Sequence, residues 1–175
     1  PRSMVYFTSV DPAGISKDAK SDSDYNTVVT CGKDLVTGRI YVVDYYHERS
    51  AGDDTKGTPG DLIQAIFDHV RRWSPVKVKI ETVAYQSTLA YWVRERMRKE
   101  SLFFMIEECS HPRGTKEARI RCLQPLFASG TILVRSYMQA LVNELLAFPF
   151  GKHDDLIDAL AAQMDMWSAT SMARK

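Results

Sequence analysis

The chain has 175 residues, of which 45% are hydrophobic and 26% charged, a composition typical of one folded domain rather than of a disordered or fibrous segment. The formal net charge is +1, so a nucleic-acid surface has to be a local patch rather than a general excess of positive charge. The odd number of cysteines favours reduced thiols, and the sequence has neither a membrane-spanning apolar run nor a signal-peptide pattern.

The first half of the sequence predicts three antiparallel strands followed by a helix. The predicted strands cover residues 4–10, 26–32 and 39–47. Pro12 ends the first strand because it has no N–H for the sheet, and this leaves Asp11 at the carboxyl end of that strand. Thr58 and Pro59 are typical of a helix start, with threonine as the cap and proline at the first helical position.

The second half predicts strands that alternate with helices. Extended segments are expected at 76–80, 102–106 and 131–134, and helices after Ser87, from Thr115 through Phe127, at 136–147 and from about His153. Glu81 stands at the carboxyl end of the segment 76–80. In the helix after Ser87 the side chains expected to face the core are Leu89, Trp92, Val93 and Met97.

This order of elements predicts an α/β fold with a mixed sheet, in which three antiparallel strands are followed by parallel strands, with helices on both faces. The order resembles the ribonuclease H-like arrangement, a likeness of fold that by itself says little about activity. In such a sheet the first strand lies beside the fourth, so Asp11 and Glu81 should be neighbours. Open α/β sheets tend to bind ligands at the carboxyl ends of their strands.

A cluster of carboxylates opens the last predicted helix. Its members are Asp154, Asp155 and Asp158. Taken alone, the cluster is typical of a capped helix start whose acids favour the helix dipole. Asp11 alone fits a turn before a proline, and Glu81 alone fits a solvated strand end. Acids that converge from three places on one sheet edge favour a cation site instead, because close carboxylates repel one another unless a cation neutralises them.

The ligand types indicate which cation would bind. Several carboxylates without paired cysteine or histidine ligands favour Mg²⁺ or Mn²⁺ over zinc. Two such ions about 4 Å apart can hold the attacking and departing oxygens of a phosphodiester, so that no histidine general base is needed.

Four short segments, spread over nearly the whole chain, carry a resemblance to a known family. They are Val10–Gly14, Ile80–Gln86, Lys116–Ile120 and Phe148–Ala159. In this order they resemble the nuclease domain of the large terminase subunit of tailed bacteriophages. The resemblance implies a metal-dependent endonuclease that cuts concatemeric phage DNA during genome packaging, in the cytoplasm of the host cell and without a membrane. It also implies that residues 1–175 form one nuclease domain of a longer chain with an N-terminal ATPase motor, and that the small terminase and the portal are partners.

The resemblance also implies roles for individual acids. Asp11 and Glu81 are the implied metal ligands on the strands, and the cluster supplies a third, for which Asp155 and Asp158 are the first choice. Asp154 is either the helix cap or a ligand itself. The predicted catalytic set is therefore Asp11, Glu81, Asp155 and Asp158, with two ions of Mg²⁺ or Mn²⁺.

Basic residues near the acids are predicted to contact the phosphates of double-stranded DNA. They are Arg113, Lys116, Arg119 and Lys152. A second basic group at 94–99 is interpreted as a solvated helix face. Nothing in the sequence resembles a helix-turn-helix or a zinc finger, so we expect little sequence specificity.

Other functions stay open at this point. The nearest alternatives are another ribonuclease H-like nuclease, either a Holliday-junction resolvase or a ribonuclease H. The segment 148–159 and the pair Lys116 and Arg119 favour the terminase type over both. A non-catalytic DNA-docking module of the packaging machine is disfavoured by acids at all three places. A nucleotide phosphotransferase is disfavoured because a second glycine-rich phosphate loop is missing.

Overall fold

The computed structural model describes residues 3–13, 25–49, 58–82, 87–109 and 115–169. The elements in chain order are β1 (Met4–Asp11), β2 (Tyr25–Asp34), β3 (Ile40–Arg49), α1 (Pro59–Trp73), β4 (Lys77–Glu81), α2 (Ser87–Glu100), β5 (Ile106–Cys109), α3 (Lys116–Arg121), α4 (Gln124–Ala128), β6 (Ile132–Leu133), α5 (Gln139–Ala147), α6 (Asp155–Ala161) and α7 (Met164–Ala169). Among these elements, no helix has both the length and the apolar character that a membrane span requires.

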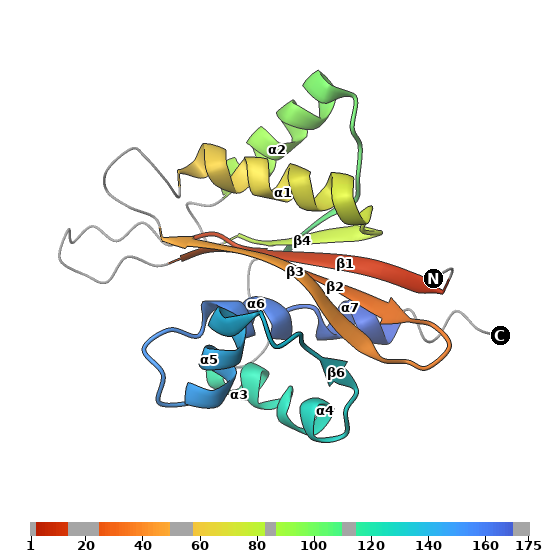
Figure 1. Cartoon of the computed structure of the whole chain (residues 1–175). Coiled ribbons are helices and arrows are strands. Elements are labelled where there is room, and N and C mark those ends of the chain that lie inside the picture. The colour runs from red at the N-terminus through yellow and green to blue at the C-terminus, as the bar shows by residue number, and fades with distance from the viewer. Residues whose placement is uncertain (1–2, 14–24, 50–57, 83–86, 110–114, 170–175) are drawn as a thin grey trace.

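The described strands form one mixed sheet in the order β5-β4-β1-β2-β3-β6 (Figure 1). Strands β1, β2 and β3 are antiparallel neighbours. Strand β4 runs parallel to β1, β5 parallel to β4, and β6 parallel to β3. This topology confirms the predicted sheet, in which an antiparallel meander is extended by parallel strands.

Helices cover both faces of the sheet, with α1 and α2 on one face and α3 to α7 on the other (Figure 1). Successive side chains of a strand point to opposite faces. Val10 therefore packs in the core under α1 and α2, whereas Phe7 packs in the core with Leu156 and Leu160 of α6. The same alternation puts Ser9 and Asp11 on the face that α6 covers.

Two helix starts follow the predicted capping chemistry. The Thr58 hydroxyl accepts the N–H of Asp61 at 3.2 Å, and the Asp61 carboxylate accepts the N–H of Thr58 at 3.0 Å, which is a capping box at the start of α1. The Thr115 hydroxyl accepts the N–H of Ala118 at 3.2 Å and so caps α3. This second cap fixes where the basic residues of α3 begin.

The helix predicted from Thr115 through Phe127 is two helices, α3 and α4. Pro125 has no N–H to donate to the preceding turn, and the continuous helix stops before it. The last predicted helix is likewise divided, into α6 and α7. Both differences are breaks inside helical segments, so the layers of the fold are unchanged.

The strand predicted at 102–106 begins only at Ile106. Residues 102–105 lead the chain from the end of α2 to β5, with Phe104 packed against Phe67 of α1 at 5.5 Å between ring centroids. Leu102 and Phe104 pack against the core, whereas Phe103 and Met105 are exposed, and the Met105 carbonyl accepts the N–H of Val78 at 2.8 Å. The prediction that Trp92 faces the core is wrong, since it is 58% exposed and the small Ala90 takes a buried position instead.

Candidate active site

Two parallel strands bring the first two acids together. Strands β1 and β4 pair in register with Val10 opposite Ile80, so the next residues, Asp11 and Glu81, end the two strands side by side. Helix α6 lies against β1 and β2 and places Asp158 over the same edge. One carboxylate oxygen from each acid lies within 4.8 Å of the others, so the geometry suits one shared cation.

The charges of this group oppose one another. Burial raises the pKa of Asp11 well above its usual range, and the charges of Glu81 and Asp158 raise it further. Burial and the Asp158 charge likewise raise the pKa of Glu81. Burial also raises the pKa of Asp158, although Arg119 partly offsets this effect. Three repelling carboxylates with only oxygen donors fit a hard divalent cation such as Mg²⁺ or Mn²⁺, which would relieve the repulsion.

Arg119 orients the acid of α6. Its Nε and Nη2 atoms contact the same oxygen of Asp158, Oδ1, at 2.8 Å and 2.6 Å. A fixed guanidinium fork of this kind holds a carboxylate in one orientation. The side chain is 11% exposed, so Arg119 belongs to the packed site rather than to the outer surface.

Lys116 lies among all three acids of the cluster predicted from the sequence. Its Nζ atom is 2.6 Å from Asp154 Oδ1, 3.7 Å from Asp155 Oδ1 and 3.7 Å from Asp158 Oδ2. Burial alone would lower the pKa of Lys116, but the surrounding carboxylates outweigh it and raise the pKa. Lys116 and Arg119 are three residues apart on one face of α3, which explains why both reach the cluster.

The structure separates the clustered acids by position. Asp158 joins Asp11 and Glu81, whereas Asp154 and Asp155 lie outside that group, beside Lys116. Of the other predicted DNA contacts, Lys152 is exposed just before α6, and Arg113 lies outside the described residues.

The interpretation of Asp154 as the helix cap is wrong. Asp154 occupies the N-cap position, but in the described part of the chain its side chain accepts none of the α6 N–H groups. Glu144 of α5 supplies the cap instead, since its Oε2 accepts the N–H groups of Leu156 at 2.9 Å and Ile157 at 3.1 Å. A carboxylate at this position also favours the helix dipole.

Glu144 is buried, and its surroundings change its acidity. Burial raises its pKa to about 7, and the charges of Asp155 and Asp154 raise it while the two N–H groups lower it. Its other oxygen, Oε1, lies 3.8 Å from His47 Nε2. Burial lowers the pKa of His47 to about 4, so the ring is neutral at physiological pH. Sequence reasoning missed Glu144, because an acid in an amphipathic helix resembles a solvated one.

Polar residues beneath α6 fix it to the sheet. The Ser9 hydroxyl donates to the Ala159 carbonyl at 2.6 Å and accepts from Gln163 Nε2 at 2.9 Å, and Gln163 also donates to the Val29 carbonyl at 2.8 Å. Lys79 Nζ donates to the Ala162 carbonyl at 3.0 Å. Sequence reasoning also missed Ser9 and Lys79. Strand alternation gives a signal, because each stands two residues before an acid of the site.

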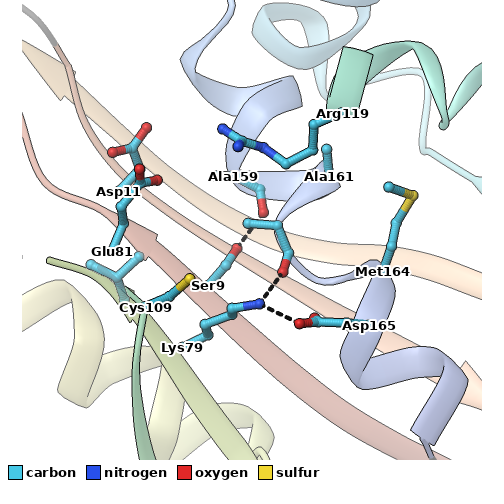
Figure 2. A pocket seen from close by; sticks show the side chains of 12 residues that line it. Ser9, Asp11, Lys79, Glu81, Cys109, Arg119, Ala159, Ala161, Met164 and Asp165 are labelled. Atoms are coloured by element: carbon cyan, nitrogen blue, oxygen red, sulfur yellow. Dashed lines mark hydrogen bonds and ion pairs between the residues drawn. The ribbon is translucent and has the colours of Figure 1, made fainter. Parts of the chain in front are cut away.

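A cavity of about 450 Å³ adjoins the acids. It is lined by Ser9, Val10, Asp11, Lys79, Glu81, Cys109, Arg119, Ala159, Ala161, Ala162, Met164 and Asp165. Figure 2 shows Asp11, Glu81 and Lys79 on the strands, with Arg119 across the cavity from them and the Lys79 ammonium bonded to Asp165. Asp11 and Glu81 therefore line a cavity, and Ala159 and Ala161 of α6 form part of its apolar wall.

The sheet order, the helices on both faces and the acids on β1, β4 and α6 define a ribonuclease H-like fold. Among solved structures, the P22 large terminase nuclease domain matches with a TM-score of 0.65 and 14% identity, over 95% of this chain and 82% of that one. The human cytomegalovirus terminase nuclease domain, soaked with Mn and inhibitor-bound, matches with a TM-score of 0.63 and 12% identity over the same shares, 95% and 82%. The fowlpox virus Holliday junction resolvase matches with a TM-score of 0.55 and 16% identity, over 95% of this chain and 99% of that one.

These likenesses confirm the predicted fold and the resemblance to terminase nuclease domains as a structural similarity. No protein-family model and no curated protein matches the sequence. The chain thus has the fold of these nucleases and a candidate acidic triad, Asp11, Glu81 and Asp158.

Proposed function

We propose that the chain is a metal-dependent DNA endonuclease of the terminase type, which cleaves concatemeric phage DNA during packaging by two-metal-ion hydrolysis with little sequence specificity. The observation that carries the proposal is the convergence of Asp11, Glu81 and Asp158 within 4.8 Å beside an open cavity. The fold likeness to two terminase nuclease domains supports it.

In this mechanism the protein supplies a fixed set of oxygen ligands. Asp11, Glu81 and Asp158 would hold one ion, and Asp158 with Asp155 or Asp154 would hold a second. When bound, the ions supply an activated water and neutralise the charge on the departing 3′ oxygen. Arg119 keeps Asp158 oriented through Oδ1. Arg113, Lys116, Arg119 and Lys152 are the proposed phosphate contacts, and such contacts carry no base information.

The test is cleavage of supercoiled plasmid by the folded chain with Mn²⁺ or Mg²⁺. We expect nicked and linear products from the wild type, and a loss of at least about 100-fold in rate for Asp11→Ala and Glu81→Ala, since each removes one ligand of the ion. Asp68→Ala is the control, because this exposed acid lies on α1, on the other face of the sheet, and should cut like the wild type. An inactive wild type, or equal cutting by Asp11→Ala, contradicts the proposal.

A same-fold nuclease is the second candidate, supported by the likeness to the fowlpox virus resolvase. Cutting of four-way junctions alone would establish a resolvase, and cutting of RNA–DNA hybrids alone a ribonuclease H. A chain that binds duplex DNA without cutting any of these substrates would be a docking module. The segment 148–159 favours the terminase type, since it carries the family resemblance and also forms the start of α6.

We propose the same cellular setting that the resemblance implies. The chain would act as one nuclease domain, 1–175, behind an ATPase motor, with the small terminase and the portal as partners in the host cell cytoplasm. Co-purification with a phage small terminase or portal tests the partners. A chain that cuts DNA but retains neither partner would contradict this setting and leave the nuclease activity standing.

A further inference from the structure

The Lys116 ammonium lies where a second cation would be expected. It is surrounded by the same three carboxylates that sequence analysis proposed as additional metal ligands, with its Nζ atom 2.6 Å from Asp154 and 3.7 Å from both Asp155 and Asp158. None of these contacts involves Asp11 or Glu81 in the described structure. The ammonium therefore lies against Asp154, Asp155 and Asp158, whereas Asp11 and Glu81 of the triad have no ion pair with it in the described structure.

The charges of the site explain why the Lys116 ammonium lies among the acids. The site gathers five carboxylates, Asp11, Glu81, Asp154, Asp155 and Asp158, against two cations, Lys116 and Arg119. One divalent ion in the inner triad reduces the remaining net charge from −3 to −1. A second divalent ion then meets the positive Lys116 among its own ligands, and at such short range their repulsion is strong.

Of the two basic residues, Lys116 is the one that can move. Arg119 is 11% exposed and is held by two contacts to one oxygen. Lys116 is 42% exposed, begins α3, and carries its charge at the end of a flexible stem. An ammonium can exchange one anionic partner for another without moving the helix, and a DNA phosphate offers such a partner.

We propose that Lys116 occupies the second cation position of the metal-free site, and that a divalent ion binds there tightly only after Lys116 has transferred to a phosphate of bound DNA. This inference rests on the proposed nuclease function. The first ion then binds to Asp11, Glu81 and Asp158 without DNA. The second ion binds when a phosphate is in place, so the site is fully loaded only with substrate present.

The test measures Mn²⁺ binding directly, without cleavage. Isothermal titration of the wild type should give one tight ion and a second that binds at least about tenfold more weakly. Lys116→Met keeps most of the stem and removes the charge, so its second ion should bind at least about tenfold more tightly than in the wild type. Lys116→Arg keeps the charge and should resemble the wild type. Lys99→Met on α2, across the sheet, is the matched control and should change nothing.

A DNA arm tests the transfer to phosphate. A short duplex with cleavage-resistant phosphorothioate linkages should increase the affinity of the wild type for the second Mn²⁺ ion. It should have little effect on that affinity in Lys116→Met. Thermal melting of each variant checks folding, and Lys116→Gln replaces Lys116→Met if that variant does not fold.

The outcomes separate the two proposals. The role of Lys116 is overturned if the wild type binds two ions with equal affinity, or if Lys116→Met binds the second ion no more tightly than the wild type does. Plasmid cutting by the wild type would leave the proposed nuclease function standing in either case. If DNA does not increase the affinity of the wild type for the second ion, the transfer of Lys116 to phosphate is overturned. A wild type that binds no Mn²⁺ overturns the metal-dependent function itself, and with it the inference.

Discussion

Glu144→Ala tests how the acidic helix is held in place. The substitution removes the acceptor for the N–H groups of Leu156 and Ile157 at the start of α6. Each buried N–H left without a partner costs about 1–3 kcal/mol, and loss of a helix cap alone costs about 0.5–2 kcal/mol. We therefore expect the free energy of unfolding to fall by about 2–4 kcal/mol under conditions where Glu144 is protonated in the folded state.

The pH dependence gives the sharper part of this prediction. Burial raises the pKa of Glu144 from 4.5 to about 7, so the folded state holds this proton more tightly than the unfolded chain does. The stabilising contribution is complete below about pH 4.5 and is lost as the pH rises to about 7, at about 1.4 kcal/mol per pH unit. The difference amounts to about 3 kcal/mol. The destabilisation by Glu144→Ala should therefore shrink from about 2–4 kcal/mol near pH 5 to about 1 kcal/mol or less at pH 8.

The assay is urea unfolding of the metal-free chain, followed by circular dichroism between pH 5 and pH 8. Glu144→Gln keeps an oxygen acceptor but cannot ionise, so its stability should vary less with pH than that of the wild type. Glu95→Ala, an exposed acid on α2, serves as the control and should follow the wild type at every pH. A destabilisation by Glu144→Ala that grows between pH 5 and pH 8 would refute the reasoning.

Three further substitutions probe the site without measuring cleavage. Asp11→Asn removes one repelling charge, so it should raise the melting temperature in EDTA. Saturating Mn²⁺ should raise the melting temperature of the wild type by several degrees and should not raise that of the variant. An equal effect of Mn²⁺ on both proteins would contradict the assignment of Asp11 as a metal ligand. Ser9→Ala breaks the contact with Ala159 and should lower stability by about 1–2 kcal/mol and weaken Mn²⁺ binding, as calorimetry would show. An unchanged Mn²⁺ affinity would show that this contact does not position Asp158. Lys79→Met removes the bond to the Ala162 carbonyl and should act in the same direction, and additive losses with Ser9→Ala would mean that the two contacts act independently.

The positions of Asp11 and Glu81 could be predicted from the sequence because they depend on local patterns. Pro12 marks the end of one strand, the order of elements sets strand neighbours, and parallel neighbours end at the same edge. Asp158 was one of three candidates, and sequence spacing could not separate it from Asp155. The distinction depends on the rotation of α6 about its axis, which its apolar contacts with Phe7 and the other core residues set.

The contacts of Glu144 and Lys116 could not be predicted, because each joins two segments whose packing the sequence pattern does not specify. Glu144 reaches α6 from α5, and Lys116 reaches it from α3. Asp154 was one candidate for the helix cap because capping preferences are local statistics, whereas here the carboxylate of a buried residue from another helix accepts the first N–H groups of α6. Trp92 was misplaced for a related reason, since periodicity defines an apolar stripe only to within about one residue.

Helix α6 is held at three places by groups that are not themselves members of the acidic triad. Glu144 binds its first N–H groups, Ser9 its middle, and Lys79 the carbonyl at its end. These contacts hold the backbone of α6, and Arg119 holds the Asp158 carboxylate near Asp11 and Glu81. The burial that raises the pKa of each acid, and the repulsion that adds to it at Asp11 and Glu81, are therefore present in the metal-free folded state, and a divalent ion would bind to acids that are already in position. The position of the Lys116 ammonium depends on a flexible side chain, whereas the positions of the triad acids depend on the packed sheet and helix. This difference is the physical reason to expect an ion to bind at the triad before a second ion binds beside Lys116.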